Sequence, residues 1–437
     1  MPTLFCPYCA VPTPMRQFFL QPRSVFLIVA VAIGLRLAAG AYLEWRLPVG
    51  QQFELGDSHG YWKLAECIAA GKPYYYAEAD AQVFRMPGFP TVLAPIFLIV
   101  GPNASPMWGR ALSALLGGIT AALMVWWGAT LFDLRAGLIA GWIAAVYPGA
   151  VAMGAFVLSE APLMPLLAAH LALATAAFKA ATVRTSILLS IATGLAAAGA
   201  VYMRPSWLLF VPFSLLIGVL RYPSRWRIAS QGAVVVAVIC LCLVPWWVRN
   251  YRVTGHFVLT TLQVGVSLYD GLNPNADGGS NMNFSLGDVL VFHREHFQGA
   301  DSDLNEFTLD QCYRQLAIQW AQANPLRVIK LVGIKFSRLW NVIPNEPMFR
   351  SWPLKLSVAL TFTPLMAFGL YGLMKFSPRG WPYFLAGLPA LYFTLLHVIF
   401  VAGIRYREPA MLGLIVLASG VISDRFQTRA HGRASTR

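Results

Sequence analysis

Long apolar stretches recur along the whole chain, and they constrain the fold more than any single motif does. Ten of them have roughly the length that a helix needs to cross a hydrocarbon core of about 30 Å. Only 12% of the residues are charged and 57% are hydrophobic, a balance that excludes an ordinary soluble domain. The sequence therefore predicts an all-α, polytopic membrane protein with about ten transmembrane helices, in a range of about nine to twelve. The predicted spans are residues 24–43, 108–131, 136–157, 160–178, 185–203, 206–220, 228–247, 354–374, 382–403 and 408–423.

The chain divides into three predicted regions. Residues 1–23 form a cytoplasmic N-terminal segment, residues 24–423 a membrane-embedded region, and residues 424–437 a basic cytoplasmic tail. The first apolar stretch contains Arg36 and is about 20 residues long, which is typical of a retained anchor rather than a cleaved signal peptide.

Residues 87–101 are apolar but number only about 15 and begin with a proline, so we expect a re-entrant or interfacial segment instead of a span. With this segment not spanning, the basic residues of the short connections and the two termini fall on the cytoplasmic side, as the positive-inside rule requires. They lie within residues 16–23, 135, 179–184, 221–227, 375–379 and 425–437. The net charge of +14 is therefore a topology signal and no indication of nucleic-acid binding. The same topology places all 19 acidic residues except Asp133 and Asp424 on or near the outer side.

Two connections on the outer side are large, residues 44–107 and 249–351, whereas the cytoplasmic connections are short. In the second one, Asp303 and Glu306 resemble a capping box at the start of a helix that ends near residue 324. The segment 326–340 mixes apolar and basic residues in a way that suits a helix lying in the membrane interface. Its basic residues include Lys330, Lys335 and Arg338.

The first outer loop contains the most concentrated polar and aromatic chemistry of the chain. Its run GDSHGYWKLAECIAAGKPYYY contains Asp57, and the element FRMPGFP that follows contains Arg85. This loop is too polar for the bilayer interior and too aromatic for a simple linker, so we expect a site at the membrane surface. The alternative for Asp57 is a solvated loop residue or the N-cap of the following helix.

Further charged residues lie at the outer edges of the spans. Glu160 begins a span, where an ionisable group is costly and usually has a purpose, although a helix dipole also favours an acid there. Arg249, Arg405 and Arg407 lie outside, against the inside bias, which indicates a local anionic partner. Snorkelling, pairing with acids or contact with anionic headgroups would also account for them.

Short motifs in a fixed order resemble the glycosyltransferase C superfamily, close to the protein O-mannosyltransferases, the lipid A aminoarabinose transferases and their bacterial relatives. Each motif alone is weak, but together they extend over residues 24–423 with consistent sidedness. The matching pieces are Asp57 with Tyr61 and Leu64-Ala65, Gly71 with Tyr74 to Tyr76, Arg85 to Pro90, Ser159-Glu160, Arg204-Pro205, Pro245-Trp246 with Arg249-Asn250-Tyr251, and Arg405-Tyr406-Arg407.

The resemblance implies a donor sugar carried on a polyprenyl phosphate and an acceptor lipid, glycan or protein outside the inner (cytoplasmic) membrane. It implies that Asp57 is the base that takes the acceptor proton and that Arg85 contacts the donor phosphate. Glu160 is similar to a second acidic position that is Asp in the aminoarabinose transferases. Direct displacement would invert the anomeric configuration, with the phosphate leaving toward Arg85 and Arg405.

The remaining candidates bind substrate. Tyr61 and neighbouring aromatic residues would stack on sugar faces, although interfacial anchoring explains them equally well. His59 lies two residues from Asp57, so a divalent metal held by these two residues and Glu160 is conceivable, but no cofactor is firmly implied.

A transporter or flippase for a lipid-linked saccharide is the alternative function. Transporters generally bury charges near the bilayer midplane, whereas only Arg36, His170 and His397 lie clearly within the predicted spans. The sequence therefore favours a membrane-embedded transferase that contacts membrane lipids and has its active site on the outer face.

Overall fold

The computed structural model describes residues 21–48, 53, 56–76, 81–282, 286–297, 305–343 and 351–434. Within these ranges the only β pairing is an isolated bridge between Tyr76 and Ala81, which agrees with the all-α prediction. The helices are α2 Pro22–Arg46, α3 Gly56–Ala69, α4 Gly88–Val100, α5 Pro106–Leu131, α6 Leu134–Val146, α7 Pro148–Ala155, α8 Glu160–Lys179, α9 Val183–Met203, η2 Pro205–Trp207, α10 Phe210–Arg221, α11 Arg225–Thr254, α12 Val264–Gly271, α13 Leu286–Phe297, α14 Glu306–Ala323, α15 Pro325–Trp340, α16 Trp352–Phe376, η5 Ser377–Arg379, α17 Trp381–Ile399 and α18 Ile404–Ala434.

Eight helices of the described chain are long and apolar enough to cross a membrane, and the bent pair α6–α7 makes a ninth if it is one span. The eight are α2, α5, α8, α9, α11, α16, α17 and α18. The one remaining predicted span, residues 206–220, corresponds to the shorter apolar pair η2 and α10. The chain is therefore a polytopic membrane protein.

The predicted span 136–157 is broken in two. Its halves α6 and α7 are bent by 51°, and Pro148, which has no N–H to continue the first helix, begins the second one. The carbonyls of Ala144 and Ala145 at the end of α6 accept hydrogen bonds from the buried Arg36 guanidinium of α2 (2.9 and 3.1 Å). A helix C-terminus carries partial negative charge, so it can hold this cation without a carboxylate.

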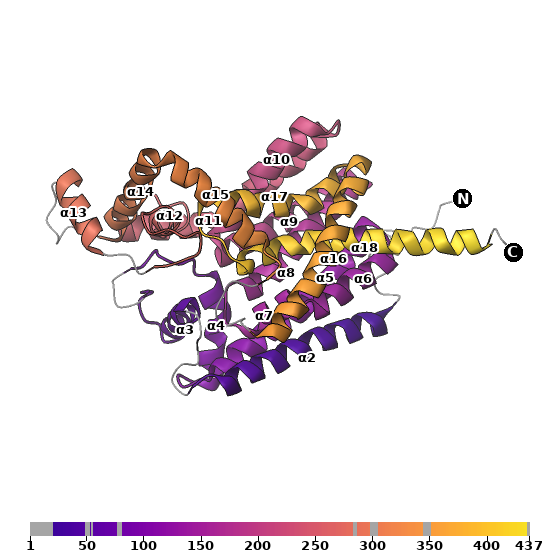
Figure 1. The fold of residues 1–437 in the computed structure, drawn as a ribbon, viewed down its shortest axis with the longest axis horizontal. Helices are drawn as coiled ribbons and strands as arrows, with labels where there is room; N and C mark the ends of the chain where they lie inside the picture. The colour runs from indigo at the N-terminus through magenta and orange to yellow at the C-terminus, as the bar shows by residue number, and fades with distance from the viewer. Residues whose placement is uncertain are drawn as a thin grey trace, which may run out of the picture.

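Helices of the two large connections gather at one end of the bundle. In Figure 1, α3, α12, α13 and α14 lie at the left, whereas α18 extends out of the opposite side. We call the first of these the loop end. It contains the two large connections that the sequence predicts on the outer side, so any site built from them lies there.

The short helix α4 fits the expectation that residues 87–101 do not span. Its 13 residues, at about 1.5 Å each, cover about 20 Å, less than a hydrocarbon core of about 30 Å. The helix begins at Gly88, against the end of α9. A Cβ at this position would lie 2.5 Å from the carbonyl oxygen of Tyr202, so only glycine allows the two elements to approach this closely.

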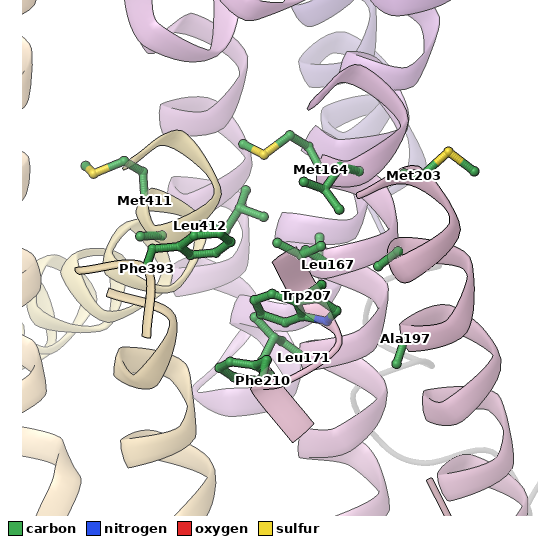
Figure 2. Packing of buried hydrophobic residues seen from close by; sticks show 14 of the residues in the cluster. Met164, Leu167, Leu171, Ala197, Met203, Trp207, Phe210, Phe393, Met411 and Leu412 are labelled. Atoms are coloured by element: carbon green, nitrogen blue, oxygen red, sulfur yellow. The ribbon is translucent and has the colours of Figure 1, made fainter. Parts of the chain in front are cut away.

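The core below the loop end packs around Trp207. After α9 ends, Pro205 starts the short helix η2, which turns Trp207 back into the bundle, where it is 1% exposed. Figure 2 shows its indole between residues of α8 and Phe393 of α17, and it stacks on Phe210 at 4.0 Å. This anchoring fixes the break between α9 and η2, and with it the position of Arg204.

Candidate active site

Five charged side chains from distant parts of the sequence meet at the loop end, and we call them the charge cluster. Asp57 lies in the first turn of α3, Glu160 begins α8, Arg204 follows the last residue of α9, and Arg405 lies in the first turn of α18. Arg85 comes from the loop before α4. Asp57, Glu160 and Arg405 each lie in the first turn of a helix. The packing of that helix fixes the backbone position of each side chain.

Arg405 joins the two carboxylates of the charge cluster. Its Nη1 and Nη2 each donate to Oδ2 of Asp57 at 3.2 Å, while its Nε and Nη2 donate to Glu160. Arg204 donates to Glu160 as well, and Nη2 of Arg85 donates to Oδ1 of Asp57 at 2.6 Å. Three guanidinium groups against two carboxylates leave one excess positive charge. The cluster is therefore suited to attract an anion.

The two carboxylates differ in their access to solvent. The side chain of Glu160 is 1% exposed, whereas that of Asp57 is 31% exposed. Burial alone would raise the pKa of Asp57, but the positive charges of Arg85, Arg405 and Arg204 outweigh it and lower the pKa from 3.8 to about 2. Asp57 is thus ionised and accessible, whereas Glu160 is enclosed by its two arginine partners.

Aromatic and polar groups surround the Arg85 guanidinium. Its carbon lies 5.3 Å from the ring centroid of Tyr61 and 5.1 Å from that of Tyr76. Gln263, from the second large connection, accepts a hydrogen bond from Nη1 of Arg85 at 3.2 Å. The hydroxyl of Tyr74 donates to the Arg85 carbonyl at 3.3 Å. Tyr61 therefore reaches the charge cluster, where its ring lies beside the Arg85 guanidinium.

Glu306 holds the loop that carries Arg85. Its carboxylate accepts hydrogen bonds from the backbone N–H groups of Gln82 (2.9 Å) and Val83 (3.0 Å). The predicted capping box is wrong, because Asn305 is the N-cap of α14 and accepts from the Thr308 amide instead. Asp303 lies outside the described residues. Two segments more than 200 residues apart are thus joined at the site.

Arg249 lies outside the charge cluster, although the sequence suggests a phosphate ligand there. It belongs to the last turns of α11, which extend the helix beyond the predicted span, and its Nη1 donates to the carbonyl of Gln82 at 2.8 Å. Its guanidinium carbon lies 4.8 Å from the ring centroid of Trp246 and 5.5 Å from that of Tyr74. In this position Arg249 braces the Arg85 loop.

His59 is exposed, and its ring lies edge-on to that of Phe53, with 6.1 Å between the centroids. Asp57 and Glu160 are both bonded to arginines, so the three residues do not fit a metal site. Among the residues that the structure describes, no group of three or more His, Cys, Asp or Glu side chains is placed to hold a metal ion.

The sequence reasoning left several members of the site unassigned. Arg204 carried a usable signal, because it is a basic residue at the outer edge of a span, as Arg249 is. Gln263 and Glu306 carried no signal for their roles, since these roles arise from contacts between two loops that no local pattern encodes. Tyr76 belongs to the Tyr74 to Tyr76 motif, but the motif does not predict its contact with Arg85. Arg407, in contrast, is buried against the ring of Phe362 at 3.7 Å.

Comparison with known proteins gives matches at the level of structure. No protein-family model matches the sequence, and no curated protein matches it significantly. The archaeal oligosaccharyltransferase AglB from Archaeoglobus fulgidus, in complex with an inhibitory peptide and a dolichol-phosphate, matches 94% of this chain at a TM-score of 0.55 and 13% identity. The apo form of the Archaeoglobus fulgidus oligosaccharyltransferase matches with the same TM-score and 15% identity.

ArnT from Cupriavidus metallidurans, bound to undecaprenyl phosphate, is similar over 91% of this chain and 76% of its own length, with a TM-score of 0.48 and 15% identity. The present chain spans about half the length of the oligosaccharyltransferase, 52% of it. At such identities the likeness concerns the fold. The chain thus shares the fold of the Archaeoglobus fulgidus oligosaccharyltransferase over nearly its whole described length.

Proposed function

We propose that this protein is a membrane glycosyltransferase that moves a sugar from a polyprenyl-phosphate donor to an acceptor on the extracytoplasmic face of the inner membrane, with Asp57 as general base. One observation carries the proposal. Asp57 is an ionised, accessible carboxylate held between Arg85 and Arg405 at the loop end of a membrane bundle. Such a bundle lets a lipid tail remain in the bilayer while its phosphate reaches the cations.

In the proposed reaction, Asp57 accepts the proton of the acceptor hydroxyl as its oxygen attacks the anomeric carbon. The bond between that carbon and the phosphate oxygen breaks, and its electron pair stays on the polyprenyl phosphate. Arg85 and Arg405 stabilise the charge of the departing phosphate, since guanidinium groups match phosphate oxygens in geometry. A direct displacement of this kind inverts the configuration at the anomeric carbon.

Donor binding also makes Asp57 a better base. Before binding, the surrounding arginines hold the pKa of Asp57 at about 2, too low for efficient proton abstraction near neutral pH. A phosphate that takes over the guanidinium hydrogen bonds adds negative charge and frees the carboxylate. Both effects raise the pKa of Asp57, so the base becomes active when the donor is in place.

Glu160 has a supporting role in this scheme. It is fully enclosed and bonded to Arg204 and Arg405, so it holds Arg405 toward Asp57 rather than reaching the acceptor itself. The acceptor, whether lipid, glycan or protein, approaches from the side on which Asp57 is exposed.

The test is to offer the purified protein, in lipid nanodiscs, a panel of polyprenyl-phosphate sugars and acceptors and to follow product formation by mass spectrometry. Asp57→Asn should abolish transfer. Glu66→Gln is the matched control, because Glu66 pairs with the exposed Lys63 of the same helix α3 at 2.9 Å and lies outside the charge cluster. If proteoliposomes move the intact donor across the bilayer and no new glycosidic bond forms, the protein is a flippase and the proposal fails.

A further inference from the structure

A short irregular segment sets the position of Arg405. Helix α17 ends at Ile399 and α18 begins at Ile404, and residues 400–403 between them form no regular structure. We call these four residues the connector. Arg405 follows it by two residues and donates to both Asp57 and Glu160. Any shift of the connector therefore changes how Arg405 joins the two carboxylates.

The second large connection holds the connector through its backbone. The N–H of Ala402 donates to the carbonyl of Gly278 at 2.9 Å. Gly271, at the end of α12, packs against the carbonyl of Phe400, and a Cβ at position 271 would lie 2.6 Å from that oxygen. Two turns of the outer region thus contact the connector directly, at Phe400 and Ala402.

Lys335 of α15 makes the third contact. The sequence predicts it among the basic residues of a helix that lies in the membrane interface, but the structure buries it completely, at 0% exposure. Its Nζ donates to the carbonyl of Ile399, the last residue of α17, at 2.7 Å. A cation stabilises the free carbonyls at a helix C-terminus. Burial lowers the pKa of Lys335 to about 8, against the opposing attraction of Asp270.

Asp270 ties this lysine to the loop that touches the connector. It is 3% exposed, and its carboxylate accepts hydrogen bonds from Oγ of Ser280 (2.6 Å) and the amide of Asn281 (2.8 Å). These bonds close the loop 270–281 on itself and keep Gly278 against the connector. The lysine and the loop therefore act on the same segment from adjacent positions.

The bundle side of the connector is equally ordered. A ring nitrogen of His397 lies 2.7 Å from the carbonyl of Val401, and the His397 ring stacks on Tyr406 at 4.6 Å between centroids. Tyr406 in turn faces the guanidinium of Arg405. Contacts thus run without interruption from the outer region to the charge cluster.

We propose that Lys335 is a positioning residue, which by fixing the end of α17 and the connector holds Arg405 between Asp57 and Glu160 and so couples the outer region to the donor-phosphate site. The part of this proposal that concerns the donor rests on the proposed function. The part that concerns the connector does not.

The experiment compares Lys335→Met with Lys330→Met, the same change at an exposed lysine of the same helix. Hydrogen–deuterium exchange of the full-length protein in nanodiscs should rise in peptides covering residues 399–407 for Lys335→Met only. In the transfer assay, Lys335→Met should lower kcat/KM for the donor by about 10- to 100-fold, as expected for a misplaced catalytic group, and leave the acceptor KM within about twofold.

A double variant tests whether Lys335 acts through Arg405. If it does, Lys335→Met combined with Arg405→Gln should be no worse than Arg405→Gln alone, because effects on one pathway are not additive. Gly271→Ala, which presses on the Phe400 carbonyl, should reproduce the exchange and kinetic changes if Lys335→Met does not fold.

The outcomes separate the two proposals. Increased exchange at residues 399–407 in a protein without transfer activity would support the connector and overturn the proposed function. Normal transfer with Lys335→Met indistinguishable from Lys330→Met, or additive losses in the double variant, would overturn the positioning role and leave the proposed function intact.

Discussion

Replacement of Asp57 by Asn should tighten the binding of polyprenyl phosphate while it abolishes sugar transfer. In the structure, the carboxylate of Asp57 occupies guanidinium hydrogen bonds of Arg85 (2.6 Å) and Arg405 (3.2 Å) that a phosphate would use. Asparagine keeps the size of the side chain but removes the competing negative charge. The net charge of the charge cluster rises by one, which favours the anion.

The pKa of Asp57 gives the size of the effect. A fall from 3.8 to about 2 corresponds to about 2.4 kcal/mol of interaction between the carboxylate and its surroundings, or about 60-fold in affinity. The side chain is 31% exposed, so solvent screening reduces this upper limit. We expect about tenfold tighter binding, together with a loss of about 10²- to 10⁴-fold in kcat, the usual contribution of a general base.

The assay titrates the purified protein in nanodiscs with a short-chain polyprenyl phosphate and measures turnover of the matching sugar donor in the same preparation. Glu66→Gln controls for the loss of one negative charge from α3 outside the charge cluster. Retained turnover would refute the role of Asp57 as base. Weaker or unchanged binding of the phosphate would refute the competition between carboxylate and phosphate for the same arginines.

Three further predictions follow from the site and its supports. Glu160→Gln leaves the guanidinium groups of Arg204 and Arg405 without their buried counter-ion, so we expect a loss of about 3–5 kcal/mol in stability, visible as a lower thermal midpoint in detergent; an unchanged midpoint would contradict the ion pairing. Gly88→Val cannot fit against the Tyr202 carbonyl, so it should separate α4 from α9 and lower both the midpoint and transfer, whereas Gly34→Val, where a Cβ meets nothing within 4 Å, should not. The pKa of Lys335 is about 8 in the folded protein, against an ordinary value of 10.5 in the unfolded chain. Between these pH values the unfolded chain holds more protons, so the free energy of unfolding rises with pH, by up to about 3 kcal/mol. Thermal melts of the wild type and Lys335→Met from pH 7 to 10 should show this rise in the wild type alone.

Much of the fold follows from the sequence because apolar length is a local property. The spans at residues 24–43, 108–131 and 160–178 appear as α2, α5 and α8 with bounds that differ by a few residues. The interruption at Pro148 is different, since many spans tolerate proline. Whether a helix breaks there depends on what its freed backbone meets, here the guanidinium of Arg36.

The composition of the site was predictable in part. Asp57, Arg85, Glu160 and Arg405 lie together, and the sequence predicts all four on the same side. Sidedness does not give distance, however. Arg249 lies on the same side yet braces the Arg85 loop, because α11 continues two turns beyond its apolar stretch.

The role of Lys335 could not be predicted from the sequence either. A lysine among apolar residues at the membrane surface ordinarily extends toward headgroups, since its ammonium group is strongly hydrated. Its inward orientation depends on the Ile399 carbonyl and on Asp270, which are distant in the sequence. Only the assembled outer region supplies these partners, so no pattern within α15 could reveal the role.

The carbonyls that accept hydrogen bonds from Arg36 also affect how α2 inserts into the membrane during synthesis. An arginine near the centre of a membrane helix costs about 2.5–3.5 kcal/mol on insertion scales. Two of its three hydrogen-bond acceptors, the carbonyls of Ala144 and Ala145, belong to residues synthesised more than 100 positions later. Until α6 has been made, the Arg36 guanidinium therefore lacks two of its three acceptors, so we expect α2 to reach its final position only when α6 packs against it.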